Sequence, residues 1–206
     1  MFEDTFRDEL RHLISDNLLI DKLWSEIQSN YNTPVRYYHN VNHLDSLIDQ
    51  LLPIKNQIED WQTLTFSVAY HDIIYNTLRQ DNEEQSAAFA YDRLTQLNLP
   101  PVQKEKCKLQ ILATKQHQMS NNADTNYFID ADLSILGFDN NSYLEYAEQI
   151  RKEYSHVPDI LYKRGRKRVL ESFLIMKHIF KTKYFQDKYE EQAKFNISGE
   201  LQSLSQ

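Results

Sequence analysis

The chain has 206 residues, of which 41% are hydrophobic and 26% charged, and this fits one medium-sized domain with a substantial core. Its formal net charge of −7 argues against broad, non-specific binding to DNA or RNA, because such binding needs a basic surface. A single cysteine, Cys107, excludes an intramolecular disulfide, and no apolar run approaches the ~20 residues that cross a bilayer, so we expect a cytoplasmic protein without membrane contact.

Composition and helical periodicity predict an all-α fold. Three glycines, where average usage gives roughly fourteen, leave little turn chemistry for an all-β chain. The region 1–33 holds two expected helices, 2–17 and 20–31, with apolar side chains at helical spacing: Phe2, Phe6, Leu10 and Leu13, then Ile20, Leu23, Trp24, Ile27 and Tyr31. Further helices are expected at about 41–52, 60–75, 82–98, 101–118, 125–137, 141–154, 159–182 and 186–204. We therefore predict one domain over 1–206, a bundle of eight to ten helices.

Three of the seven histidines lie in two short segments, "YYHNVNHL" at 37–44 and "AYHDIIYN" at 69–76. His39 and His43 share a face if their helix begins at or just before His39. The pair His71–Asp72 interrupts an apolar stripe, where a buried imidazole and carboxylate need a hydrogen bond, an ionic partner or a cation. An internal hydrogen bond explains a lone His–Asp pair, whereas the two segments together indicate a metal site.

A third segment, "YFIDADLSILGF" at 127–138, offers two aspartates. At ~100° per residue, its apolar side chains spread over an arc with Asp132 near the centre, and Asp130 lies on the opposite side. We therefore expect Asp132 to face the interior, where it needs a partner. Asp130 is expected to cap a helix, pair with a cation or meet solvent.

The set His43, His71, Asp72 and Asp132 resembles the H…HD…D motif of the HD superfamily of metal-dependent phosphohydrolases. The resemblance runs from about residue 34 to 201 and is to a compact bacterial subfamily of predicted HD phosphohydrolases. It is carried, in chain order, by "RYYHNVNH", "AYHDIIYN", "DNEEQSA", "ILATKQH", "IDADLSILG", "YAEQIRKEY", "RKRVLESFL" and "EEQAKFN". In the last segment Lys194 stands where the family has arginine, which keeps the charge and loses the bidentate fork.

The resemblance implies an HD-like core and C-terminal helices over 34–201, and one divalent metal ion held by His43, His71, Asp72 and Asp132. Two nitrogens and two carboxylate oxygens suit Mn, Co, Ni, Fe or Zn, and Mg with added water. The implied activity is hydrolysis of a small phosphomonoester or nucleotide by metal-activated water.

The resemblance gives the catalytic work to two residues. Asp72 belongs to the metal site, and His39 would donate a proton to the leaving oxygen of the ester. A helix cap, or a hydrogen bond to one of the metal ligands, is the alternative role for His39.

The negatively charged phosphoryl group needs cations around it, and three lie near the motifs. Arg36, Lys115 and Arg166 are the candidates, with an exposed, solvated cation as the alternative for each. His117 is a further candidate for binding phosphate or a second metal. Binuclear HD proteins generally add two histidines in this interval, and His117 is the only one here, so one ion is expected.

Other functions stay open at the level of sequence. A catalytically silent HD module that binds metal and senses a phosphorylated ligand or partner would use the same four ligands, whereas an HD-fold oxygenase would need a binuclear site. The basic run at 163–168 is able to contact nucleic acid, but a solvated helix face is the favoured interpretation in an acidic protein. Within that run, Gly165–Arg166 resembles a fixed point of the subfamily, which implies that Arg166 points inward, toward the anion.

Overall fold

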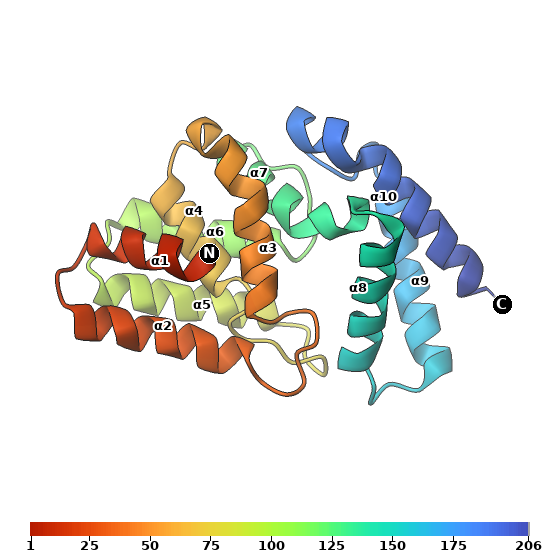
Figure 1. Ribbon diagram of the computed structural model, residues 1–206, viewed down its shortest axis with the longest axis horizontal. Helices are drawn as coiled ribbons and strands as arrows, with labels where there is room; N and C mark the ends of the chain where they lie inside the picture. The colour runs from red at the N-terminus through yellow and green to blue at the C-terminus, as the bar shows by residue number, and fades with distance from the viewer. Residues whose placement is uncertain (206) are drawn as a thin grey trace. The chain divides into compact units, whose positions relative to one another are not determined.

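The computed structural model describes residues 1–205, and this part of the chain contains ten α-helices, two short 3-10 helices and no strand (Figure 1). The prediction of an all-α chain with eight to ten helices is confirmed. Its contacts define two compact units, Met1–Phe128 and Ile129–Gln206, and the division falls inside helix α7 (Ala123–Asp132). The expectation of one domain stays a prediction. No helix in the described part of the chain is long and apolar enough to cross a membrane.

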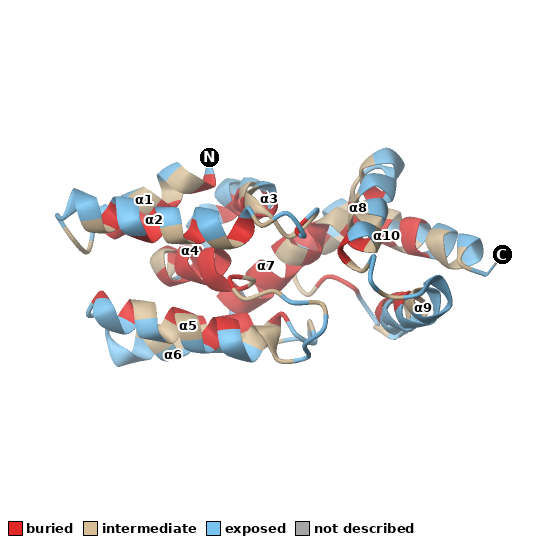
Figure 2. Cartoon of the chain, turned by 90° about the horizontal axis from the view of Figure 1, so that it is seen from below, coloured by how far each residue is buried: buried red, intermediate tan, exposed pale blue. Residues whose placement is uncertain are grey.

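The elements of unit 1 before α7 are α1 (Phe2–Arg11), α2 (Asn17–Tyr31), α3 (Val41–Leu51), η1 (Leu52–Gln57), α4 (Trp61–Tyr70), α5 (Asn82–Gln96) and α6 (Pro101–Ala113). Unit 1 is organised around one buried helix, α4. Each residue of this helix except Gln62 is buried, including the polar Thr63, Thr65 and Ser67. It lies between the layer of α1 and α2 and the layer of α5 and α6 (Figure 2), as expected for a helix without a solvent face.

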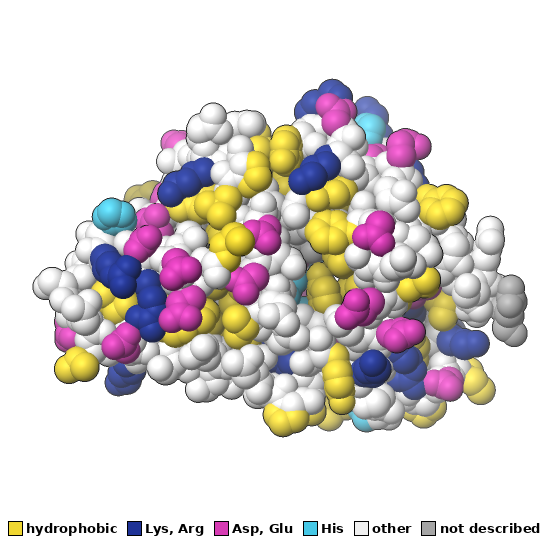
Figure 3. All heavy atoms as spheres, in the orientation of Figure 1, with side chains coloured by type: hydrophobic (Ala, Val, Ile, Leu, Met, Phe, Trp, Pro, Cys, Tyr) yellow, Lys and Arg dark blue, Asp and Glu magenta, His cyan; other side chains and the backbone are white. Residues whose placement is uncertain are grey.

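The two N-terminal helices bury the apolar side chains that the periodicity selects, apart from the half-buried Leu13. The ring of Phe6 lies 6.2 Å from Trp24 of α2 and 5.9 Å from Phe66 of α4, so that α1 and α2 are joined to the central helix. The first helix ends at Arg11 rather than at 17. The side chain of Asp16 accepts from the N–H groups of Leu18 and Leu19 and so caps the start of α2. Figure 3 shows acidic and basic side chains side by side over these helices.

Unit 2 contains η2 (Leu133–Gly137), α8 (Asn140–Glu153), α9 (Asp159–Ile175) and α10 (Lys183–Ser203). Helix α10 packs on η2 and α9, and α8 packs on η2. The side chain of Asn196 in α10 donates to the carbonyls of Leu136 and Phe138, which fixes the turn after η2 against α10.

The helix expected at 159–182 is wrong as a single element, since α9 ends at Ile175 and α10 begins at Lys183. Two buried carboxylates hold the intervening backbone. Glu190 accepts from the N–H groups of residues 179 and 180, at 3.0 and 3.1 Å. Asp130 accepts from those of residues 181 and 182, at 2.6 and 2.7 Å, and from the hydroxyl of Thr182. These bonds replace the helical ladder that the periodicity predicts.

Asp130 is therefore a buried anchor for the start of α10, with no exposed surface. Of the roles expected for Asp130, contact with solvent is wrong, and it does not cap a helix, since the two N–H groups that it binds precede α10. The expected contrast between the two aspartates is also wrong, because Asp130 is fully buried and Asp132 is half-buried. Burial raises the pKa of this carboxyl to about 6, against the three hydrogen bonds, which lower it. Lys194 forms an ion pair with Glu190, at 3.0 Å, so that its charge already has an acidic partner.

Gly137 allows the close approach of α10 to η2. A Cβ atom at this position would lie 2.4 Å from Cβ of Tyr189 and 2.8 Å from its carbonyl oxygen. We expect Gly137→Ala to lower the free energy of unfolding by about 1–3 kcal/mol, because the backbone of α10 must move away. Urea denaturation measures the change.

The matched control for this substitution is Gly199→Ala. Gly199 also lies in unit 2, inside α10, and a Cβ there would meet nothing within 4 Å. We expect this variant to be more stable by about 0.5–1 kcal/mol, because alanine favours the helix. Equal effects of the two substitutions would show that the contact with Tyr189 does not set the packing.

Candidate metal centre

His43 is placed by the start of α3. The side chain of Asn40 accepts from the N–H of Asn42 and donates to the carbonyl of Tyr37, which fixes the first turn of the helix. His43 lies in this first turn and is buried. The helix begins at Val41, so His39 precedes it, and the shared helical face expected for the two histidines is not formed.

His71 and Asp72 lie at the end of α4, which stops at Tyr70 rather than at about 75. His71 is the C-cap residue, and Asp72 follows it in a turn. Nδ1 of His71 lies 2.9 Å from the carbonyl oxygen of Val68. Because a carbonyl only accepts, this nitrogen carries the proton, and in the neutral imidazole Nε2 presents its lone pair.

The lone pair of His71 points to the other predicted ligands in unit 1. Its Nε2 lies 3.2 Å from Nε2 of His43 and 3.2 Å from Oδ2 of Asp72. Two donor atoms bound to one ion at about 2.1 Å lie roughly 3.0–3.4 Å apart for octahedral or tetrahedral angles. The donor set and its spacing therefore fit a divalent transition metal.

Asp132 is the last residue of α7, one helical turn beyond Phe128. The ring of Phe128 lies edge-on against His71, with centroids 5.6 Å apart. His43, His71 and Asp132 each offer one ligand atom, and these atoms lie within 4.8 Å of one another. Three of the four ligands expected from the sequence thus form a group that could bind a metal, and the fourth, Asp72, touches it through His71.

Arg36 holds together the two chain segments that carry the histidines. Its guanidinium donates to the carbonyl of His39, at 3.1 Å, and to those of Asp72 and Ile73, at 2.7 and 3.1 Å. The group is buried and lies over the rings of Tyr31 and Tyr75, at 4.8 and 5.2 Å. The alternative that Arg36 is an exposed, solvated cation is therefore wrong. Its role in binding substrate stays a prediction.

Two further side chains fix the turn that carries Asp72. The hydroxyl oxygen of Tyr31 in α2 accepts from the N–H of Asp72, at 3.1 Å. The hydroxyl of Ser86 in α5 accepts from the N–H of Ile74 and donates to its carbonyl. Sequence reasoning missed both contacts, although Ser86 lies in "DNEEQSA", one of the segments that carry the family resemblance.

His39 lies beside the candidate metal centre without belonging to the group of three. Its ring stacks on that of Tyr75, with centroids 4.4 Å apart, and meets Tyr38 edge-on at 5.0 Å. Its Nε2 is 3.9 Å from Oδ2 of Asp72, and about a fifth of its side chain is exposed. His39 therefore has one edge toward the carboxylate and remains accessible from solvent.

The other predicted phosphate-binding residues have protein partners. Lys115 donates to both oxygens of Glu84 and to the carbonyl of Gln80. Arg166 is buried and points inward, but its guanidinium forms a bidentate ion pair with Glu200, at 2.8 and 3.0 Å. His117 is half-buried, has a positive φ of 50° and is not a member of the metal-binding group. Substrate binding by these residues stays a prediction.

Comparisons of the chain with protein-family models, with curated proteins and with solved structures gave no match. The family resemblance described above therefore stays a prediction, and the candidate metal centre rests on its own geometry.

The contacts of Arg36 predict that it stabilises the site. We expect Arg36→Met to lower the free energy of unfolding by about 2–3 kcal/mol, since three carbonyls lose a charged donor. Thermal and urea denaturation measure this. Arg79→Met is the control, because that arginine makes an exposed ion pair with Asp81. Similar unfolding midpoints for the two variants would contradict the role given to Arg36.

Proposed function

We propose that this protein is a metal-dependent phosphohydrolase that cleaves a small phosphomonoester or a nucleotide. The supporting observation is the approach of Nε2 of His43 and Nε2 of His71 to 3.2 Å, with Oδ2 of Asp72 3.2 Å from the latter. Two buried imidazoles and a carboxylate at this spacing are costly unless a proton or a cation lies between them.

In this proposal His43, His71 and Asp72 hold one divalent ion, and Asp132 completes the ligand set. Imidazole and carboxylate donors favour Mn, Co, Ni, Fe or Zn, with Mg as a further candidate. When bound, such an ion supplies a Lewis acid for a phosphoryl oxygen and lowers the pKa of a coordinated water. The bond from Nδ1 of His71 to the carbonyl of Val68 keeps the ligating nitrogen in the correct tautomer.

His39 is proposed as the proton donor. Its Nε2 lies 3.9 Å from Oδ2 of Asp72, which stabilises a protonated imidazole, and stacking on Tyr75 limits rotation of the ring. When the P–O bond of the ester breaks, the leaving oxygen takes this proton, and the imidazole becomes neutral. Arg36 acts on the same residues by positioning them, since it binds the carbonyls of both His39 and Asp72.

One observation favours a second candidate, a metal-binding module that senses a phosphorylated ligand without turnover. Arg36, Lys115 and Arg166, the cations expected around a phosphoryl group, all bind protein acceptors. Efficient phosphoryl transfer needs positive charge around the equatorial oxygens. A site that lacks such cations would bind its ligand through the metal and His39 alone.

Metal content tests the ligand set. Protein purified without chelator should contain about one transition-metal ion per chain, and Asp72→Ala should lose most of it, since removal of a carboxylate leaves fewer donors. Elemental analysis by mass spectrometry measures this. Asp187→Ala, which removes an exposed aspartate of α10, is the control. Equal metal content in the wild-type protein, Asp72→Ala and Asp187→Ala would show that Asp72 does not bind the metal.

Turnover tests the reaction. A panel of phosphomonoesters and nucleotides with Mn²⁺, Co²⁺, Ni²⁺ or Mg²⁺ should release phosphate, and His39→Ala should lower kcat by roughly 100-fold or more at unchanged metal content. If His39→Ala kept the full kcat, His39 would not be the proton donor. Bound metal without hydrolysis of any panel member would favour the sensing module instead.

A further inference from the structure

Helix α9 carries four cations that have no protein partner. Lys163, Arg164, Lys167 and Arg168 make no hydrogen bond or ion pair with any residue that the structure describes. All other arginines of the chain bind protein acceptors: Arg7, Arg11, Arg36, Arg79, Arg93, Arg151 and Arg166. Arg166, in the middle of the same basic run, is turned inward to Glu200. Among the arginines, the unpaired ones are thus confined to α9.

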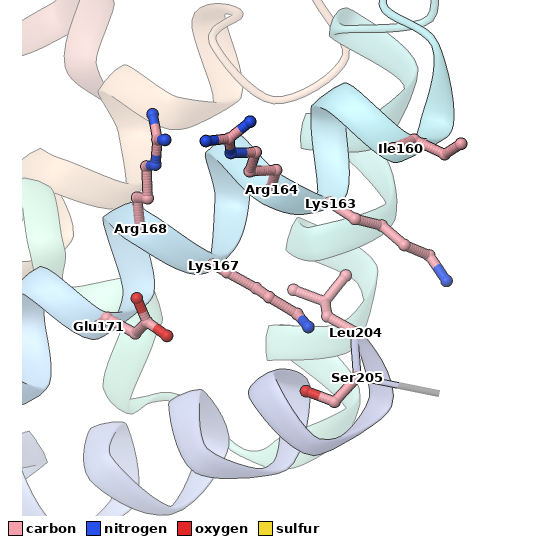
Figure 4. Close-up of a pocket in the computed structure, with 8 residues that line it drawn as sticks. All are labelled: Ile160, Lys163, Arg164, Lys167, Arg168, Glu171, Leu204 and Ser205. Atoms are coloured by element: carbon pink, nitrogen blue, oxygen red, sulfur yellow. The ribbon is translucent and has the colours of Figure 1, made fainter.

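These cations surround a surface hollow of about 540 Å³ in unit 2 (Figure 4). Lys167 extends toward Leu204 and Ser205 at the end of α10, Lys163 extends past Leu204, and Arg164 and Arg168 extend in the opposite direction. Ile160 and Glu171 complete the lining. The hollow therefore combines four positive charges, one carboxylate and two aliphatic side chains.

The arrangement is unfavourable for the isolated helix. Lys163 and Lys167 are four residues apart, as are Arg164 and Arg168, and like charges at this spacing each cost a few tenths of a kcal/mol. Glu171 lies four residues after Lys167, yet forms no ion pair with it in the described structure. A bound anion would relieve this repulsion.

We propose that the hollow binds a free small molecule that carries two or more adjacent phosphate groups. The four cations span five helical steps, about 7.5 Å along α9, which suits a pair of phosphates better than a single one. Arginine can bind phosphate through two parallel hydrogen bonds, and lysine adds a mobile point charge. The site shares no residue with the candidate metal centre and does not depend on the proposed hydrolase activity.

The size and lining of the hollow favour a free ligand over a polymer or a lipid surface. Its volume lies within the range of small-molecule sites, roughly 300–1,000 Å³. The end of α10 bounds one side through Leu204 and Ser205, so the hollow is not an open basic stripe along which a nucleic acid could run. Ile160 and Leu204 offer apolar contact to the organic part of such a ligand.

Inorganic pyrophosphate is the probe, titrated by calorimetry into the full chain with EDTA present, so that the metal centre does not contribute. Arg164→Gln/Arg168→Gln should weaken binding by about tenfold or more, because two charged hydrogen-bond donors are lost. Glu171→Gln should strengthen it by about threefold, because the one opposing charge is removed. Orthophosphate should bind more weakly than pyrophosphate.

The matched control is Lys22→Gln/Lys177→Gln, which removes the same charge from two exposed lysines outside the hollow. It should change the affinity less than about twofold, since exposed charges at a distance are screened. If both double variants lost the same affinity for pyrophosphate, the binding would come from the overall charge of the protein, and the proposed site would be wrong. Absence of pyrophosphate binding at millimolar concentration would also overturn it. Binding confined to RNA or to anionic vesicles, with the same dependence on Arg164 and Arg168, would overturn the free-ligand assignment.

Discussion

The approach of two buried imidazoles is the constraint on which unit 1 depends. With Nδ1 of His71 committed to the carbonyl of Val68, the lone pair of Nε2 faces Nε2 of His43 at 3.2 Å. Such a contact needs a shared proton or a cation, and Asp72 beside it favours positive charge. The protein fixes this geometry with Arg36, which binds the backbone of both segments, so the arrangement is held by the fold.

Both units hold irregular backbone with buried charged side chains. Arg36 satisfies carbonyls after α4, Asp124 accepts from the N–H groups of residues 59 and 60 before it, and Asp130 and Glu190 do the same before α10. A chain with three glycines has few positions that turn freely, and side-chain to backbone bonds take over that work. Function and stability are therefore coupled in the segments around the histidines.

The parts of this structure that the sequence predicts are those with a repeating pattern. Apolar spacing places α1 and α2 and their buried residues, and the clustering of His43 with His71 indicates their proximity. The ends of α4 and α9 are not predictable in this way, because the periodicity continues past both. The backbone beyond these helix ends is held by side chains of other helices, such as Tyr31 at Asp72 and Glu190 at Phe180. Charge alone likewise could not distinguish Arg36, a buried clamp, from the unpaired Arg164.

The most direct measurement is anomalous diffraction from crystals grown with Mn²⁺ or Zn²⁺, which locates the ion itself. We expect one strong peak about 2.0–2.3 Å from Nε2 of His43, Nε2 of His71 and a carboxylate oxygen of Asp72. A peak bound elsewhere, or no peak while the two imidazoles stay in mutual contact, would contradict the metal centre.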